Sequence, residues 1–321
     1  MKKMLSALLV AGFLFGVAFH IESQTQSTEE ELEGTISLSG AWALYPMVVK
    51  WAEEFQKLHP DIRIDVAAGG AGKGMADCLA QVVDIGMVSR DIYPAEIEKG
   101  AWWVSVTKDA VVPTMNRSNP VSKELLTKGV KRETFVDIWI TGKIKTWGQA
   151  AETEANDSIH VYTRSDACGA AKTWAQLLGA KQEDLLGVGV YGDPGLAEAV
   201  KRDILGIGFN NINYAYDARS QKQVDQVRIV PIDLNGNGVI DTDEDFYSMR
   251  DEIVEAIAAG KYPSPPARLL HLVSQGKPQR KIVREFIQWI LTDGQRYVPE
   301  SGYISLTKER IHEELKKLCG E

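Results

Sequence analysis

The chain has 321 residues, a formal net charge of −8, 25% charged side chains and 44% hydrophobic ones. This length suggests about two domains of ordinary globular composition. An acidic chain lacks the basic surface that binds nucleic acid or anionic lipid by charge, so both kinds of partner are disfavoured. The three cysteines, Cys78, Cys168 and Cys319, are too few and too scattered for a disulfide scaffold or a Cys-rich zinc site.

The N-terminus has the features of a secretory signal. Lys2 and Lys3 precede an apolar run from Met4 to Phe19, which is shorter than the roughly 20 residues that a membrane span needs. We expect residues 1–23 to be a signal peptide and 24–33 a solvated linker, so that the rest is periplasmic or otherwise extracytoplasmic. No small-x-small triplet marks a cleavage site, so an uncleaved anchor stays as the alternative.

The cysteines are compatible with export in two ways. Cys78 and Cys168 form a disulfide only if the fold brings them together, and otherwise act as small buried apolar residues. An odd number of cysteines leaves at least one thiol free or intermolecular.

Strands and helices alternate after the linker. We expect strands at Thr35–Leu38, Ile62–Val66 and Asp84–Val88, with helices at Tyr45–Leu58 and about 74–82 between them. The order β-α-β-α-β predicts an α/β domain with a mostly parallel sheet.

The same alternation continues toward the C-terminus. We expect an extended segment at Val104–Asn116 and strands at Ile159–Thr163, Ile204–Phe209, Val227–Ile232 and Arg268–Val273. The expected helices cover 131–140, 146–153, Gly169–Leu178, 194–203, Phe246–Ala259, 307–318, and Gln279–Leu291 with a continuation to about Val298.

Three segments place glycine, small polar residues or arginine between a strand and a helix. They are residues 39–42, residues 69–74 and residues 164–170. A helix N-terminus offers free N–H groups and a positive dipole end, and an arginine adds a bidentate clamp, so such segments can bind an anion. Residues 69–74 are not a nucleotide-binding P-loop, because Ala67 and Gly74 replace its first glycine and its Ser or Thr.

These segments resemble those of phosphate-type ABC-transporter substrate-binding proteins. Residues 39–46, 69–74 and 83–90 are similar to the opening loops of that family, and residues 164–169 to its R-x-x-G-S-G-T loop. Residues 135–147, 204–209 and 290–303 are similar to its "IFxGKIxxW", "AIGY" and "LSxxGQxxVxxxGY" segments. The similar segments follow the family's order from about residue 34 to residue 306.

The resemblance implies a two-lobed, type II-like periplasmic binding protein of the α/β class, with mixed, mostly parallel sheets joined by two crossover strands. The crossovers are expected near 110–116 and 267–273, lobe 1 at 34–112 plus 270–321, and lobe 2 at 113–269. The ligand-binding residues that the resemblance implies are Ser39, Gly40, Ala41, Trp42, Gly70, Ala71, Gly72, Ser89, Arg90, Arg164, Cys168, Gly169 and Ala170.

Several of these positions depart from the family's pattern. Family members line the anion with Ser and Thr hydroxyls, whereas this chain has Ala71 in the second loop and Cys168 and Ala170 in the third. Each lost hydrogen bond removes about 0.5–1.5 kcal/mol, so phosphate binding should be weaker or the preferred ligand different. Trp42 either reshapes the pocket or packs against the hinge.

Residues 233–244 fill all twelve positions of an EF-hand calcium loop. Calcium takes hard oxygen ligands at alternating positions, and Gly238 supplies the sharp turn. The expected ligands are Asp233, Asn235, Asn237, the Val239 carbonyl, Asp241 and Glu244. A strand precedes the loop where an EF-hand has a helix, so we interpret the calcium ion as structural.

No catalytic motif occurs, because the five histidines are isolated and no G-x-S-x-G is present. Together with this, the family resemblance implies a non-enzymatic, monomeric receptor that captures a small oxyanion, phosphate first, and delivers it to the permease of an ABC importer. The alternative is a family member with altered binding that acts as a calcium-stabilised surface or signalling protein. The thiol of Cys168, near Arg164, is either reactive or an inert replacement for serine.

Overall fold

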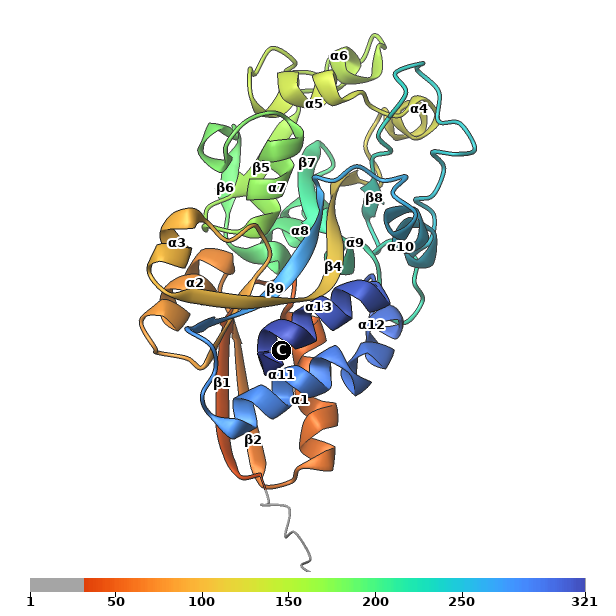
Figure 1. Ribbon diagram of the computed structural model, residues 1–321. Coiled ribbons are helices and arrows are strands. Elements are labelled where there is room, and N and C mark those ends of the chain that lie inside the picture. Colours follow the sequence, from red (N-terminus) through yellow and green to blue (C-terminus); the bar gives the residue numbers. More distant parts are fainter. Residues whose placement is uncertain (1–31, 321) are drawn as a thin grey trace, which may run out of the picture. The chain divides into compact units, whose positions relative to one another are not determined.

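The structure is a computed structural model that describes residues 32–320, so the expected signal peptide and most of the linker lie outside the described residues. One mixed sheet runs through this part of the chain in the order β2-β1-β3-β9-β4-β7-β5-β6, with β8 paired to β4 (Figure 1). Its strands are β1 (Gly34–Gly40), β2 (Ile62–Ala68), β3 (Ile85–Val88), β4 (Ala101–Asn116), β5 (His160–Arg164), β6 (Val188–Val190), β7 (Gly206–Asn211), β8 (Val227–Ile229) and β9 (Ala267–Gln275).

Helices connect and cover these strands. Those of the first half are α1 (Tyr45–Leu58), α2 (Ala71–Leu79), α3 (Pro94–Glu98), α4 (Ser122–Lys128), α5 (Arg132–Trp139), α6 (Trp147–Ala151) and α7 (Gly169–Leu177). Those of the second half are α8 (Gly192–Arg202), α9 (Ile212–Ala215), α10 (Arg250–Ala258), α11 (Lys281–Leu291), α12 (Tyr297–Glu300) and α13 (Lys308–Cys319). Two 3-10 turns, η1 (Gln182–Asp184) and η2 (Asp293–Arg296), complete the set.

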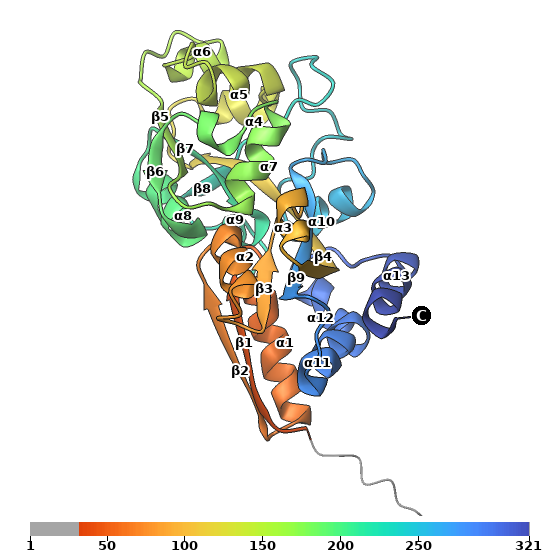
Figure 2. The same cartoon turned by 60° about the vertical axis from the view of Figure 1, so that its left-hand side comes forward.

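The direction of the strand pairs separates the ends of the sheet from its middle. β1 pairs in parallel with β2 and β3, and β5 pairs in parallel with β6 and β7. Among the named strands, every antiparallel pair involves β4 or β9, which pair with each other from Ala101↔Gln275 to Ala110↔Ala267. The two long strands thus run side by side between the two parallel groups, as Figures 1 and 2 show. The predicted α/β fold with a mixed sheet is confirmed, although the sheet is not mostly parallel, because β4 and β9 pair antiparallel with each other and with their neighbours.

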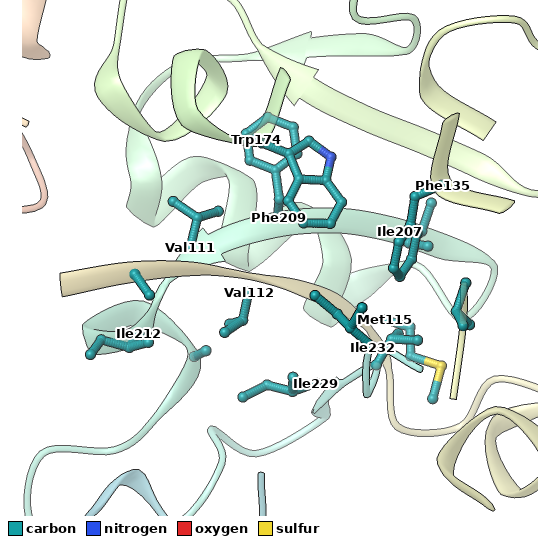
Figure 3. Packing of buried hydrophobic residues seen from close by; sticks show 14 of the residues in the cluster. Val111, Val112, Met115, Phe135, Trp174, Ile207, Phe209, Ile212, Ile229 and Ile232 are labelled. Atoms are coloured by element: carbon teal, nitrogen blue, oxygen red, sulfur yellow. The ribbon is translucent and has the colours of Figure 1, made fainter. Parts of the chain in front are cut away.

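Buried apolar side chains form two clusters, which define two lobes. Lobe 1 is the part whose side chains form the cluster from Ile36 to Val106 and from Leu270 to Leu318. Lobe 2 is the part whose side chains form the cluster from Ala110 to Ala267, to which Ile304 is added from the C-terminal segment. In the lobe 2 cluster Trp174 stacks on Phe209 at 5.9 Å between ring centroids, above the side chains of β4 (Figure 3).

Some elements differ from the sequence expectation, each for a local reason. α2 begins at Ala71, three residues earlier than expected, because Gly70 takes up φ +90° and ends the preceding strand abruptly. α10 begins at Arg250 and not at Phe246, because Phe246 and Tyr247 are buried against Tyr262 and the side chain of Glu252 caps the helix at Met249.

Other differences concern ends and short elements. The expected continuation of α11 to Val298 is replaced by η2 and the short α12, because the Gly294 carbonyl accepts a hydrogen bond from Trp51 Nε1 at 2.8 Å. β8 ends at Ile229 and not at Ile232. The short elements α3, α4, α9, β6 and η1 were not expected. Cys78, Cys168 and Cys319 are all free thiols.

Candidate functional site

The predicted anion-binding segments lie where strands end and helices begin in both lobes. The segment after β1 leads into α1, the glycines after β2 lead into α2, and the segment after β5 leads into α7. Parallel strands place their carboxyl ends, and hence the helix N-termini that follow, on one edge of a sheet. Contacts between lobes then join these segments.

The first segment combines a close backbone approach with unpaired donors. A Cβ on Gly40, which has φ +133°, would lie 2.8 Å from Gly74 Cα, so glycine is required there. Ser39 Oγ donates to Asp77 Oδ2 at 2.7 Å, and the Ala41 N–H donates to the Met87 carbonyl at 2.9 Å. By contrast, within residues 32–320 the backbone N–H groups of Trp42 and Ala43 have no partner. These two groups are therefore available to an anion at the start of α1.

The second segment contacts lobe 2 directly. The Gly72 N–H donates to the Ala167 carbonyl at 3.0 Å, and a Cβ on Gly70 would lie 2.8 Å from Asp166 Oδ2. Ala71 between them is buried. One donor of the α2 N-terminus is thus used to hold the lobes together.

The third segment contains a fully buried arginine. Arg164 donates Nε and Nη2 to Asp166 at 2.8 and 2.6 Å, and Nη1 to Asp193 at 2.6 Å. Burial alone would lower the pKa of Arg164, but the two carboxylates raise it, so the guanidinium stays charged. A guanidinium has five N–H groups, so two remain for a ligand.

The N-terminus of α7 follows this arginine. Cys168 caps the helix through Sγ, which accepts the Ala171 N–H at 3.4 Å, while the Gly169 and Ala170 N–H groups have no partner in the described chain. Burial raises the pKa of the Cys168 thiol to about 12, which argues against the reactive thiol. A Cβ on Gly169 would overlap the Ser89 carbonyl, so Ser89 of lobe 1 lies against this helix end.

Arg90, which the resemblance implies as a ligand, is used elsewhere. Its guanidinium forms a bidentate pair with Glu96 at 2.7 and 3.0 Å, and lies 4.0 Å from the ring centroid of Tyr93. These contacts hold the Arg90 side chain on α3 and the loop before it. Arg164 is paired with carboxylates as well, but it ends the strand that leads into α7, whose first N–H groups are unpaired. This position makes Arg164 the better candidate for the arginine that clamps the anion.

Trp42 bridges the two lobes. A Cβ on Gly192 at the start of α8 would lie 3.2 Å from the indole ring, and Tyr191 packs on the ring edge at 6.3 Å between centroids. Tyr214 of lobe 2 donates its hydroxyl to the Trp42 carbonyl at 3.0 Å. The indole Nε1 is buried and has no hydrogen-bond partner among the described residues.

Two carboxylates of this site were missed by sequence reasoning. Asp166 lies two residues after Arg164, so the R-x-D spacing could have indicated an ion pair. Asp193 is far from Arg164 in the sequence, and the pairing of β5 with β6, which places Arg164 opposite Val190 just before α8, brings it close.

The predicted calcium loop forms a compact turn in lobe 2. Asp233 accepts the backbone N–H groups of Gly236 and Gly238 at 2.7 and 2.8 Å. Glu244 accepts those of Leu234 and Asn235 at 2.9 and 3.0 Å. Both carboxylates are buried, and neither forms an ion pair with a lysine or arginine of the described chain.

The rest of the loop is exposed and not arranged around a cation. Asp241 accepts the side-chain amides of Asn235 and Asn237 at 2.9 and 2.8 Å, and Val239 is exposed. Across residues 32–320, no group of three or more His, Cys, Asp or Glu side chains is placed to hold a metal ion. A cation here would have to replace hydrogen bonds within the loop.

Comparisons with known proteins agree with this architecture. The family described as the PBP superfamily domain matches residues 25–294. The phosphate-binding protein PstS of Methanocaldococcus jannaschii is 25% identical, with 89% of this chain and 86% of the relative covered. That of Bacillus subtilis is 24% identical, with 97% and 96% covered.

Solved structures show the same fold. One from Clostridium perfringens, described as a phosphate ABC transporter substrate-binding protein with bound phosphate, has a TM-score of 0.70 and 24% identity, covering 85% of this chain and 100% of that one. An ABC-type phosphate transport receptor from Vibrio cholerae has a TM-score of 0.60 and 20% identity, with 84% and 100% covered. The predicted resemblance to substrate-binding proteins is confirmed, and the family is one of binding proteins and not of enzymes. Since the match extends over most of its length, the chain belongs to the PBP superfamily.

Proposed function

We propose that this protein is an exported receptor that binds a small oxyanion, phosphate first, between its lobes and delivers it to the permease of an ABC importer. The names of its relatives support this, because both PstS proteins are phosphate-binding proteins and both solved structures are described as components of phosphate transport. We further propose that it acts as a monomer.

One observation carries the proposal. Arg164, a buried, charged guanidinium with two spare N–H groups, ends the strand before α7, where the Gly169 and Ala170 N–H groups are unpaired. Trp42 of lobe 1, whose N–H is unpaired like that of Ala43, packs against Gly192, the residue before the Arg164 partner Asp193. Unpaired buried donors cost free energy, and an oxyanion with several acceptor oxygens removes that cost. Because the donors come from both lobes, the anion favours the closed arrangement.

Most of these donors belong to the backbone, which has a consequence for selectivity. Hydroxyls can rotate to donate or accept, whereas N–H groups only donate. The site therefore suits fully deprotonated oxyanions at least as well as protonated ones. We infer that sulfate and molybdate compete with phosphate here.

The proposal that the protein is exported rests on its N-terminal sequence, because residues 1–31 lie outside the part of the chain that the structure describes. Among residues 32–320, no helix is both long and apolar enough to cross a membrane. A structure of the same fold, with a TM-score of 0.67 and 13% identity, is described as a periplasmic phosphate-binding protein. We propose the same side of the membrane for this chain.

We also propose that the loop 233–244 binds a structural calcium ion. The complete EF-hand pattern supports this, together with the two buried carboxylates of Asp233 and Glu244 that no cationic side chain of the described chain neutralises. The Asn235, Asn237 and Asp241 side chains would turn inward on binding. In differential scanning fluorimetry, Tm should be higher with millimolar calcium than with a chelator. An unchanged Tm would contradict the proposal.

The oxyanion proposal is tested by isothermal titration calorimetry with phosphate, sulfate, molybdate and acetate. Arg164→Ala should weaken phosphate binding by about 10- to 100-fold, because a hydrogen-bonded charge is worth about 1.5–3 kcal/mol. Arg63→Ala is the matched control, since Arg63 is an exposed arginine paired with Asp65. Failure of every oxyanion to bind, or binding that survives Arg164→Ala, would refute it.

A further inference from the structure

A chain of buried polar side chains leads from Arg164 to the pair of long strands that joins the lobes. Asp193 accepts Arg164 Nη1 at 2.6 Å with one oxygen and Asn211 Nδ2 at 2.6 Å with the other. The Asn211 Oδ1 in turn accepts Nη2 of Arg268, a residue of β9. These side chains are all buried.

Arg268 is anchored to the strands themselves. Its Nε donates to Asp109 Oδ1 at 3.0 Å, and its Nη2 donates to Oδ2 at 3.3 Å. Asp109 lies on β4 directly across from Arg268 in the ladder. A bidentate pair between two adjacent strands fixes the guanidinium plane.

Arg268 also reaches the other part of the anion site. Its Nη1 donates to Thr173 Oγ1 at 2.8 Å, and that hydroxyl donates to the Gly169 carbonyl at 2.8 Å. Gly169 is the first residue of α7, whose N–H is one of the unpaired donors. Arg268 on β9 therefore contacts two side chains of the anion site. Asn211 bonds to Asp193, the partner of Arg164, and Thr173 bonds to the first residue of α7.

We propose that Arg268 is a positioning residue that aligns the anion-binding groups of lobe 2 with β4 and β9, the two strands that join the lobes. It acts on Arg164 through Asn211 and Asp193, and on α7 through Thr173. The direction of each hydrogen bond between Arg268, Asn211, Asp193 and Arg164 is determined, because guanidinium groups only donate and carboxylates only accept. The Asn211 amide therefore has one orientation, which transmits the position of Arg268 to Asp193.

The alternative is that Arg268 only stabilises the fold. A buried ion pair is a weak argument for stability, because desolvation of both charges offsets their attraction. If the Arg268–Asp109 pair only stabilised the fold, it would not need the hydrogen bonds through Asn211 and Asp193 that lead to Arg164. The positioning role rests on the proposed function, whereas the hydrogen bonds that link Arg268 to Arg164 are present without any ligand.

Phosphate titration by calorimetry tests the proposal in Arg268→Lys, Asn211→Ala and Arg164→Lys. Lysine keeps the charge beside Asp109 but cannot contact Asp109, Asn211 and Thr173 together. We expect Arg268→Lys and Asn211→Ala each to raise the phosphate Kd about tenfold. In the Arg164→Lys background, Asn211→Ala should have less than a third of that effect, because its action passes through Arg164.

Asn116→Ala is the control for a purely structural effect, since Asn116 is also a buried asparagine and its Nδ2 donates to the Val200 and Lys201 carbonyls of α8 within lobe 2. An equal loss of affinity in Asn116→Ala, or full additivity of Asn211→Ala with Arg164→Lys, would overturn the proposal. The Arg164 Nε–H resonance in ¹⁵N NMR provides a readout without ligand. It should shift in Asn211→Ala and Arg268→Lys but not in Asn116→Ala.

The Arg164 resonance distinguishes failure of the proposed function from failure of the positioning role of Arg268. If the unaltered chain binds no phosphate, the proposed function fails, and the Arg164 resonance alone decides on positioning. An unchanged resonance in both Asn211→Ala and Arg268→Lys would overturn the role of Arg268, whatever the ligand is.

Discussion

The backbone N–H of Gly72 donates a hydrogen bond over 3.0 Å to the carbonyl oxygen of Ala167 and so joins the start of α2 in lobe 1 to the loop before α7 in lobe 2. A Cβ on Gly72 would lie 2.8 Å from Ala167 Cβ and 3.1 Å from the Ala167 oxygen. The two lobes therefore touch through positions at which there is no room for a side chain.

Gly72→Ala should separate the lobes without unfolding either of them. The backbone at Gly72 needs no positive φ, so alanine is tolerated locally and the clash is only with lobe 2. We expect a larger radius of gyration in small-angle X-ray scattering and about tenfold weaker phosphate binding. Gly195→Ala, which meets only a Val190 methyl group, should leave both values unchanged. Unaltered scattering in Gly72→Ala would contradict the role of this contact.

Trp42→Phe should weaken anion binding while keeping the contact between the lobes. Phenylalanine retains an aromatic ring beside Gly192 but removes the unpaired indole Nε1. If that N–H donates to the ligand, its loss removes about 1 kcal/mol, or about fivefold in Kd. The change in tryptophan fluorescence on phosphate addition should also decrease. Trp102→Phe on β4 is the control, and equal effects of the two variants would count against Trp42.

Glu244→Gln should abolish calcium stabilisation. Position 12 of an EF-hand loop supplies a bidentate carboxylate, and an amide replaces it poorly. We expect the rise in Tm with millimolar calcium to disappear in this variant. Asp243→Asn changes the neighbouring, exposed acid, which pairs with Lys261 and occupies a non-ligating position of the loop, so it should keep the rise. A calcium response that persists in Glu244→Gln would exclude this loop as the site.

Acid should destabilise the protein through His271. Burial, with Arg310, Lys317 and Arg90 nearby, lowers the pKa of His271 to about 3 in the folded chain, whereas the unfolded value is about 6.5. Between these values the unfolded chain binds a proton that the folded chain does not. Stability is therefore lost as pH falls from about 6.5 toward about 3, by at most about 1.4 kcal/mol per pH unit.

Urea unfolding of His271→Asn at several pH values measures this contribution. The free energy of unfolding should depend less on pH in the variant, because asparagine can keep a hydrogen bond with Ser105 without titrating. His312→Asn, at an exposed position of α13, should behave like the unaltered chain. Parallel pH curves for His271→Asn and the unaltered chain would contradict the prediction.

Elements with strong local signals were predictable from the sequence. The bounds of α1 were predicted correctly, because Pro46 near its start and the His59-Pro60 pair after its end mark both ends. β6 was missed because it has three residues with a glycine at its centre. α2 was predicted too late because the glycine-rich segment gives no apolar periodicity until after its first turn. The boundaries of the lobes remain a prediction.

The candidate site was predictable only in part. Arg164 stands in a recognisable motif, but its partner Asp193 comes from another helix, and no spacing rule connects the two. The pairing of Arg90 with Glu96 likewise depends on the turn into α3, which the sequence pattern did not indicate. Sequence patterns identify residues that suit an anion, whereas the choice between ligand and ion-pair partner is made by packing.

Because β4 is long enough to belong to both lobes, the protein cannot be cut between the lobes without breaking its sheet. Its early residues belong to the lobe 1 cluster and its later residues to the lobe 2 cluster, and β9 makes the same transition in the opposite direction. A fragment cut at this boundary would lose the partner strand of its sheet and expose unpaired backbone groups along the break. Because both strands pass through both lobes, the lobes should unfold as a single cooperative unit, and calorimetry should record one transition.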